Sequence, residues 1–194
     1  MSRRRFRTTT AFTAAVVLAF TTSCTDNPEP PGGPATSPPS SSTLPPSPPT
    51  PSVAPAPTPP AAAAGITVTS ADAFARFYLT AIDHAAATGD VTTLRTWSDK
   101  GCISCNKLIK HYTDVYGAGG SVTGNFRSTN AKTTSARLKD TKAADITLQF
   151  TEGRHTIVPS KGAKPTVFPG GQSQWQMALM NQSGHWVMYE MRDQ

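Results

Sequence analysis

Apolar residues recur with a helical period early in the stretch 66–194 and with an alternating period later in it. After Asp72 they follow the spacings that place side chains on one face of a helix of about five turns. This face consists of Phe74, Phe77, Tyr78, Ala81, Ile82 and Ala85. Thr69 and Asp72 have the spacing of a capping box, which predicts the start of the helix, and Gly89 predicts its end.

Two more helices are predicted before the pattern changes. Asp90 is a residue type that caps helices, and a short helix that holds Trp97 is predicted after it. A third helix is predicted from Cys102 to Tyr116, because the apolar side chains between them share one face. The glycine-rich stretch 117–120 then ends the helical pattern.

The rest of the chain has the period of two that is typical of β-strands. Residues 174–180 and 185–191 alternate in this way, and 181–184 predicts the turn of a hairpin between them. Further strands are predicted over 121–128, 137–139, 145–151 and 154–159, with a tight turn at Glu152 and Gly153. Helices followed by an antiparallel sheet form an α+β fold, in which the helices pack on one face of the sheet because neither layer buries its apolar side alone.

The first 23 residues have the three parts of a secretory signal peptide. Four arginines precede a short apolar stretch, 11–20, and small residues precede Cys24. The apolar stretch is too short for a membrane span, which takes roughly 20 residues. The basic residues at the start fit the twin-arginine export pathway as well as general secretion.

The small residues before Cys24 resemble a bacterial lipobox, in which the cysteine receives a diacylglyceryl group. The resemblance implies that lipid on Cys24 anchors the chain on the extracytoplasmic face of the cell membrane. Ordinary cleavage beside an incidental cysteine is the alternative.

Residues 24–65 are predicted to form a disordered tether. Fifteen of the 18 prolines lie between Pro28 and Pro60, separated mostly by Ser, Thr and Ala. Such a stretch cannot bury enough apolar surface to fold, and proline favours an extended chain of about 3.1 Å per residue. We therefore expect a signal peptide over 1–23, an anchor and tether over 24–65, and a globular domain over 66–194.

The net charge of +6 gives no reason to expect a nucleic-acid partner. Four of the 18 Lys and Arg residues belong to the predicted signal peptide, so the rest of the chain has 14 of them against 12 Asp and Glu. A net charge of +2, scattered along the sequence, does not make the basic surface that binds DNA or RNA.

Cys102 and Cys105 are the strongest candidates for covalent chemistry. Two nearby cysteines outside the cytoplasm usually form a disulfide, and this spacing lets their sulfur atoms meet. A structural disulfide closing so small a loop would contribute less than the roughly 3 kcal/mol of a 15-residue loop. The alternative is a thiol-disulfide oxidoreductase, because a helix N-terminus favours the thiolate. We favour the structural interpretation, since redox Cys-x-x-Cys motifs occur in a βαβ context and a helix precedes this one.

Other sites are less clearly marked. Aromatic side chains are candidates to line a ligand pocket, although their spacing also fits core packing. These candidates are Tyr78, Trp97, Tyr112, Trp175 and Trp186. The four histidines lack metal-ligand spacing from the cysteine pair, and the common hydrolase and phosphate-binding motifs are missing, so no metal and no cofactor is predicted.

Five short motifs resemble an actinobacterial lipoprotein family of unknown function. They are F-x-x-F-Y at 74–78, A-T-G-D at 87–90, W-S-D at 97–99, C-x-x-C at 102–105 and G-G-x-x-x-G at 119–124. The order of elements from Val68 to Met191 also resembles the nuclear transport factor 2-like cone fold, in which a curved sheet wraps a long first helix. These resemblances imply a location and a fold, and no activity.

Enzymes with that fold use an Asp and a Tyr inside the cavity, whereas here Asp83 and Asp114 are predicted to lie on solvated helix faces. We therefore expect a non-catalytic domain that binds a small ligand or a protein of the cell wall or envelope. A thiol-disulfide oxidoreductase that uses Cys102 and Cys105 is the alternative function.

Overall fold

The computed structural model describes residues 55–125 and 127–194. The predicted signal peptide, the predicted lipid site at Cys24 and most of the predicted tether lie outside the described residues. Among the helices of the described part, none has the length and apolar character needed to cross a membrane.

The described residues form three α-helices ahead of the strands, as predicted: α1 (Val68–Thr88), α2 (Thr92–Trp97) and α3 (Ile103–Gly117). The start of α1 was predicted two residues too late. Thr67 is the N-cap: its hydroxyl accepts a hydrogen bond from the Ser70 N–H, and the Ser70 hydroxyl accepts one from the Thr67 N–H, both at 3.0 Å. Serine takes the place of the usual Glu in this capping box, which is why the Thr69–Asp72 spacing was misleading.

In the part of the chain that the structure describes, seven strands follow and form two antiparallel sheets. The four-stranded sheet has the order β2-β3-β6-β7 and consists of β2 (Ser128–Leu138), β3 (Ala143–Glu152), β6 (Gly171–Gln182) and β7 (His185–Asp193). The three-stranded sheet has the order β1-β4-β5 and consists of β1 (Ser121–Gly124), β4 (His155–Val158) and β5 (Thr166–Phe168).

The sequence-based prediction located some strands wrongly. It predicted strands over 121–128 and 137–139, whereas β1 ends at Gly124 and β2 runs from Ser128 to Leu138. Most of β2 was missed because it is rich in Ser, Thr and exposed residues and lacks an apolar alternation. It also missed β5. The predicted turn at Glu152 and Gly153 does not form a hairpin, since β3 and β4 belong to different sheets.

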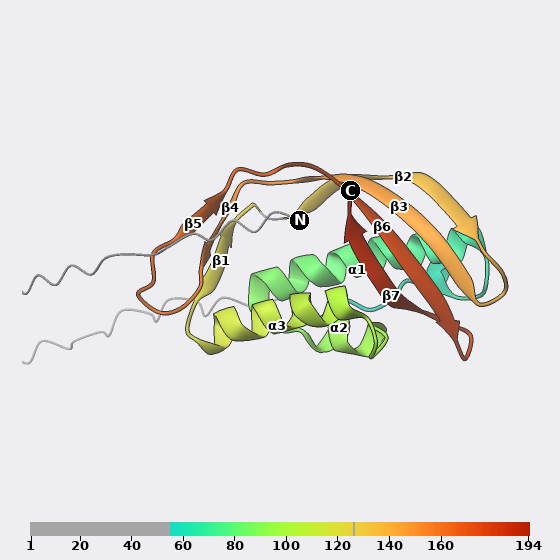
Figure 1. Ribbon diagram of the computed structural model, residues 1–194, viewed down its shortest axis with the longest axis horizontal. Helices are drawn as coiled ribbons and strands as arrows, with labels where there is room; N and C mark the ends of the chain where they lie inside the picture. Colours follow the sequence, from blue (N-terminus) through green and yellow to red (C-terminus); the bar gives the residue numbers. More distant parts are fainter. Residues whose placement is uncertain (1–54, 126) are drawn as a thin grey trace, which may run out of the picture. The chain divides into compact units, whose positions relative to one another are not determined.

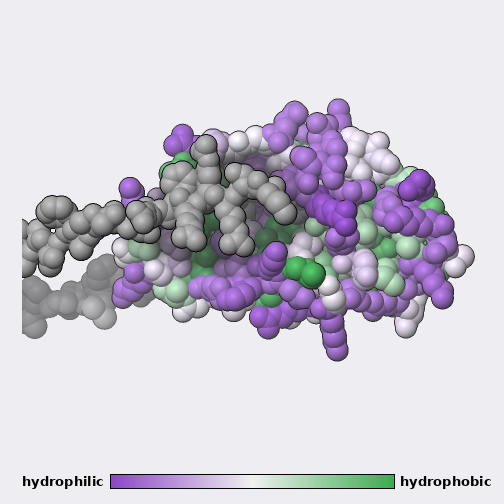
Figure 2. All heavy atoms as spheres, viewed as in Figure 1, coloured by the Kyte–Doolittle hydropathy of each residue, from purple (hydrophilic) through white to green (hydrophobic). Residues whose placement is uncertain are grey.

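The helices pack against a curved antiparallel sheet, so the predicted α+β architecture is confirmed. Figure 1 shows β2, β3 and β6 arching over one side of α1, while α2 and α3 lie on its other side. Alternate residues of β3 face α1 and are buried, among them Ile146 and Leu148. They meet the buried face of α1, which includes Phe74 and Tyr78. The side of the molecule that Figure 2 shows is mainly hydrophilic, with small apolar patches between polar side chains.

The hairpin between β6 and β7 forms where it was predicted. Gln182 pairs with His185, so Ser183 and Gly184 make a two-residue turn. Both have positive φ, at 53° and 87°, which is the conformation that matches the twist of the flanking strands.

The folded part begins earlier than the predicted boundary at 66. The 3-10 helix η1 (Ala61–Ala63) packs against α1, and Ala63 is buried. The Thr93 hydroxyl donates a 3.4 Å hydrogen bond to the carbonyl of Pro57. Residues 55–65 were predicted as the end of a disordered tether, but they contact the helices. Their proline and alanine side chains lie beside the aromatic rings of Phe74 and Trp97.

Candidate functional site

The five aromatic candidates do not line a single pocket. Tyr112 and Trp175 line a cavity, whereas Trp97 and Trp186 border a surface depression beside Pro59. Tyr78 belongs to the core. Its hydroxyl lies 2.6 Å from the Ser98 Oγ, which itself donates to the Leu94 carbonyl, so the Tyr78 hydroxyl is the donor. Burial raises the pKa of Tyr78 to about 12.

The cavity lies between α1, α3 and the strands of both sheets, and its volume is about 250 Å³. Its apolar wall includes Ile82, Leu108, Ile157, Phe168 and Trp175. Its polar groups are those of Asp83, Tyr112, Ser128, Glu152 and His155. An apolar wall with a few convergent polar groups is typical of small-ligand sites. Of the predicted residues, the structure therefore brings Tyr112 and Trp175 into a candidate site.

Asp83 lies in the wall of this cavity, which corrects the expectation that it faces solvent. Its carboxylate accepts hydrogen bonds from the Ser128 backbone N–H at 3.0 and 3.2 Å and from the Ser128 hydroxyl at 3.1 Å. These bonds join α1 to the first residue of β2. Asp114, by contrast, is exposed and pairs with Lys110 at 2.6 Å, as a solvated helix face predicts.

Burial raises the pKa of Asp83, while the hydrogen bonds from Ser128 and the charge of Arg127 act in the opposite direction. Glu152 is the Cα partner of Ser128 in the pairing of β2 with β3, so it lies beside Asp83. Burial also raises the pKa of Glu152, and His155 opposes this rise. The cavity thus holds two neighbouring carboxyl groups whose pKa values are raised, chiefly by burial.

Tyr112 projects from α3 toward the same pair. Burial raises the pKa of its hydroxyl, and the charges of Asp83 and Glu152 raise it further. The phenol therefore keeps its proton and can donate a hydrogen bond.

His155 is held at the cavity by its neighbours on both sides. Its ring stacks on Phe168 with centroids 4.9 Å apart and planes inclined by 10°. Its Nδ1 lies 3.1 Å from the carbonyl of Gly153 and must carry a proton, because a carbonyl only accepts. Trp175 packs edge-on against Phe150 at 5.3 Å.

The sequence analysis missed three polar residues of the cavity: Ser128, Glu152 and His155. They lie at strand ends, where polar side chains are ordinary. The signal that was available is the Glu-x-x-His spacing across Gly153, which places both side chains where the chain leaves one sheet and enters the other.

Glu152→Gln should change how stability depends on pH. Because the folded-state pKa of Glu152 is raised, its contribution to stability is complete below the unfolded value of about 4.3 and is lost as pH rises through the folded value. Between about pH 4 and about pH 7, the free energy of unfolding should therefore fall less for the variant than for the parent chain, as measured by urea denaturation. Parallel curves for the two proteins would contradict this.

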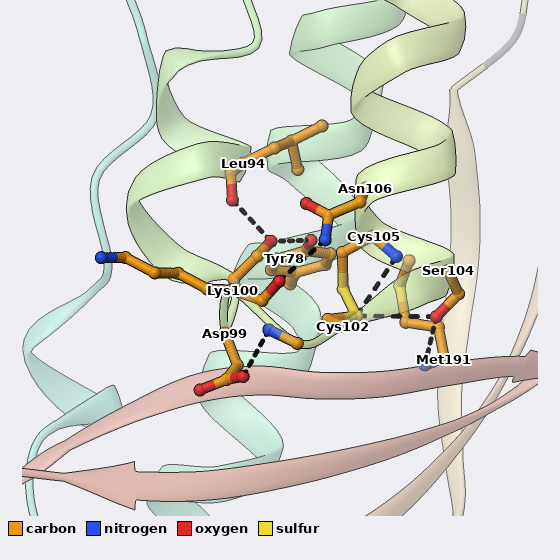
Figure 3. Close-up of a disulfide and its surroundings, with 11 residues drawn as sticks. Tyr78, Leu94, Asp99, Lys100, Cys102, Ser104, Cys105, Asn106 and Met191 are labelled. Carbon is orange, nitrogen blue, oxygen red and sulfur yellow. Dashed lines mark hydrogen bonds between the residues drawn. A yellow bond between two sulfur atoms is a disulfide. The ribbon is translucent and has the colours of Figure 1, made fainter.

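The cysteine pair lies outside the cavity, at the start of α3. The two sulfur atoms lie at disulfide distance from each other (Figure 3). Both residues are buried. Cys102 is the N-cap of α3, and its sulfur accepts a 3.2 Å hydrogen bond from the Cys105 N–H. The Ser104 hydroxyl accepts a 3.0 Å hydrogen bond from the Met191 N–H and so connects α3 to β7. These contacts favour a structural role.

We expect the Cys102–Cys105 pair to resist reduction, because 1% and 0% exposure keeps an attacking thiolate away from either sulfur. Equilibration with thiol buffers, followed by alkylation and mass measurement, should give a reduction potential below about −300 mV. A potential near −200 mV, typical of glutaredoxins, would instead support the oxidoreductase alternative.

Together these features define an α+β domain with a small cavity between its helices and sheets. A similar fold occurs in the intermembrane space region of the chloroplast protein ARC6, with a TM-score of 0.51 and 10% identity over 66% of this chain and 95% of that one. At this identity the likeness concerns the fold alone. A protein named Rd1NTF2_05, in a version with five substitutions, matches with a TM-score of 0.37 and 9% identity over 64% of this chain and 99% of that one.

Residues 48–192 match a protein-family model, and the chain therefore belongs to the family of unknown function DUF6318. The match includes the segment 55–65 that packs against the helices. No curated protein matches the chain.

Proposed function

We propose that this protein is a lipid-anchored, non-catalytic domain that binds a small ligand in the cavity between α1, α3 and the sheets. The observation that carries the proposal is the cavity of about 250 Å³, in which an apolar wall faces two carboxyl groups and the hydroxyl of Tyr112. Such an arrangement holds the body of a ligand by burial and orients it by a few polar contacts.

A binding role fits the state of Asp83 better than a catalytic one. A general base must be free to reach a substrate proton, whereas both oxygens of Asp83 accept hydrogen bonds from Ser128. The same bonds hold the carboxylate in a fixed position, which suits recognition of a ligand.

The proposed location rests on the sequence before Pro55. The signal-peptide pattern ends at Cys24, and a proline-rich stretch follows it. We assign the chain to the outer face of the cell membrane, with lipid on Cys24 as its membrane contact and the tether as a spacer. We also propose an envelope or cell-wall protein as a partner of this domain. The signal-peptide pattern, Cys24 and the proline-rich stretch support the proposal that the chain is an actinobacterial lipoprotein.

The location is tested by measuring the intact mass of the full chain purified from membranes of its native host. A mass that starts at Cys24 and includes acyl chains is expected, and Cys24→Ser should abolish both the acyl mass and membrane retention. A parent chain without acyl groups would refute the anchor and leave the cavity proposal unaffected.

Ligand binding is tested by native mass spectrometry of the same full-length material in detergent. We expect a retained small molecule that is lost in Trp175→Ala, which removes part of the wall, and in Ala86→Leu, which fills the space. Tyr189→Ala, at an exposed residue outside the cavity, is the matched control. Equal retention by all four proteins, or no retained molecule in the parent chain, would refute the proposal.

A further inference from the structure

No direct ion pair among the described residues neutralises the acidic groups of the cavity. The ion pairs formed within 4.0 Å by residues 55–125 and 127–194 include neither Asp83 nor Glu152. Arg127 and His155 act on these carboxyls only through longer-range attraction, and Asp193 adds a negative charge near Glu152. Among the described residues, no Lys or Arg lines the cavity.

The rest of the wall suits a positive charge attached to an apolar body. Tyr112 and Trp175 present aromatic rings, and Phe168 stacks on His155 at the edge. Aromatic faces attract cations, and the attraction grows when water is removed. The volume is below the roughly 300–1,000 Å³ of pockets for drug-sized ligands, so the ligand must be small.

Resting on the proposed ligand-binding function, we infer that the ligand is a small organic cation: a protonated amine or similar group on a compact apolar or aromatic body. Its charged end lies between the carboxyls of Asp83 and Glu152, and its body lies against Trp175. An anion of the same size is repelled by each carboxyl that is ionised. A neutral molecule gains only the contacts with the apolar and aromatic wall.

Proton release should accompany binding. A cation between Asp83 and Glu152 favours their ionised forms, and burial has raised the pKa of both groups in the empty cavity. Affinity for an amine should therefore increase as pH rises through these values. Arg127 lowers the pKa of Asp83 and His155 lowers that of Glu152, so both act against the effect of burial, whereas Asp193 raises the pKa of Glu152. Tyr112 stays protonated, because burial raises the pKa of its hydroxyl.

The test uses three probes of nearly equal shape: phenethylamine, phenethyl alcohol and 3-phenylpropionate. Their binding to the full chain in detergent is measured by calorimetry in two buffers of different ionisation enthalpy, which also counts released protons. We expect the amine to bind at least about tenfold more tightly than the alcohol, a difference of about 1.4 kcal/mol or more in binding free energy. Its binding should release protons. The carboxylate should bind more weakly than the alcohol.

Glu152→Gln keeps the shape of the side chain and removes its charge, so it should weaken amine binding about tenfold and leave alcohol binding unchanged. Glu190→Gln is the matched control, because it changes the net charge equally and lies outside the cavity on the edge strand β7, where Glu190 pairs with Arg192 at 2.9 Å. It should leave binding of both probes unchanged.

Two results would overturn the inference in different ways. Equal binding of amine and alcohol, lost in Trp175→Ala, would exclude the cationic ligand and leave a neutral-ligand cavity. Amine binding that Glu152→Gln and Glu190→Gln weaken equally would mark a surface charge effect and also exclude it. Absence of binding by all three probes, or binding that Trp175→Ala leaves intact, would overturn both this inference and the proposed cavity function.

Discussion

Trp186→Ala should lower the free energy of unfolding by about 4 kcal/mol, within the range for large aromatic residues replaced in a core. Trp186 is 1% exposed and lies near the start of β7. Its indole N–H donates a 3.0 Å hydrogen bond to the Ser70 hydroxyl, the group that also caps α1. The substitution therefore opens a void and removes the link between β7 and the N-terminus of α1.

Trp175→Ala is the comparison variant for the stability loss expected of Trp186→Ala. Trp175 lies on the neighbouring strand β6 and is only partly buried, because the cavity lies on one side of it. We expect its replacement to cost less than about 2 kcal/mol, since less surface is removed from contact. Urea denaturation of both variants measures the difference in the free energy of unfolding. Equal losses would contradict the assignment of Trp186 to the core and of Trp175 to the cavity wall.

Gly120→Ala should cost about 3 kcal/mol, at the upper end of the usual cost of forcing extra atoms into a packed site. A Cβ on Gly120 would overlap the carbonyl oxygen of Val158 and would lie 2.7 Å from that of Val115. Both are backbone atoms, so neither can turn away. The link between α3 and β1 must shift instead.

Gly117→Ala is the matched control, three residues earlier in the same glycine-rich stretch. Gly117 is the last residue of α3, and a Cβ there would meet no atom within 4 Å. Alanine should be neutral or stabilising by up to about 1 kcal/mol, because it is the better helix former. Thermal or urea denaturation should separate the two variants, and similar stabilities would contradict the close approach at Gly120.

The shift at Gly120 should also reach the cavity. β1 and β4 contribute Val122 and Ile157 to its wall, and they are the strands that the extra methyl group pushes apart. Loss of ligand binding in Gly120→Ala, with binding kept in Gly117→Ala, is therefore expected alongside the loss of stability.

Local patterns in the sequence predicted most of the elements that bury an apolar stripe. The helical spacing from Phe74 to Ala85 defined α1, and Gly89, with φ of 76°, ends it where expected. The alternation in β3, β6 and β7 and the turn at 181–184 were also readable, because each depends on residues close together in the chain.

Elements without an apolar stripe were predicted only in part or not at all. The eleven residues of β2 are mostly polar, and they form a strand because β3 offers them a free edge. The short β5 likewise exists through pairing with β4. Pairing partners come from distant parts of the chain, so no local pattern contains them.

By itself, then, the sequence determined the order of the three α-helices of the described residues, the apolar faces of the core strands and the nearness of Cys102 to Cys105, since these follow from spacing along one segment. Tertiary structure alone decided the division into two sheets, the packing of residues 55–65 and the cavity. Asp83 looked like a solvated residue until β2 supplied Ser128 and β3 supplied Glu152 beside it. A binding site of this kind depends on which segments fold onto each other, and burial acts on its carboxyl groups only after that has happened.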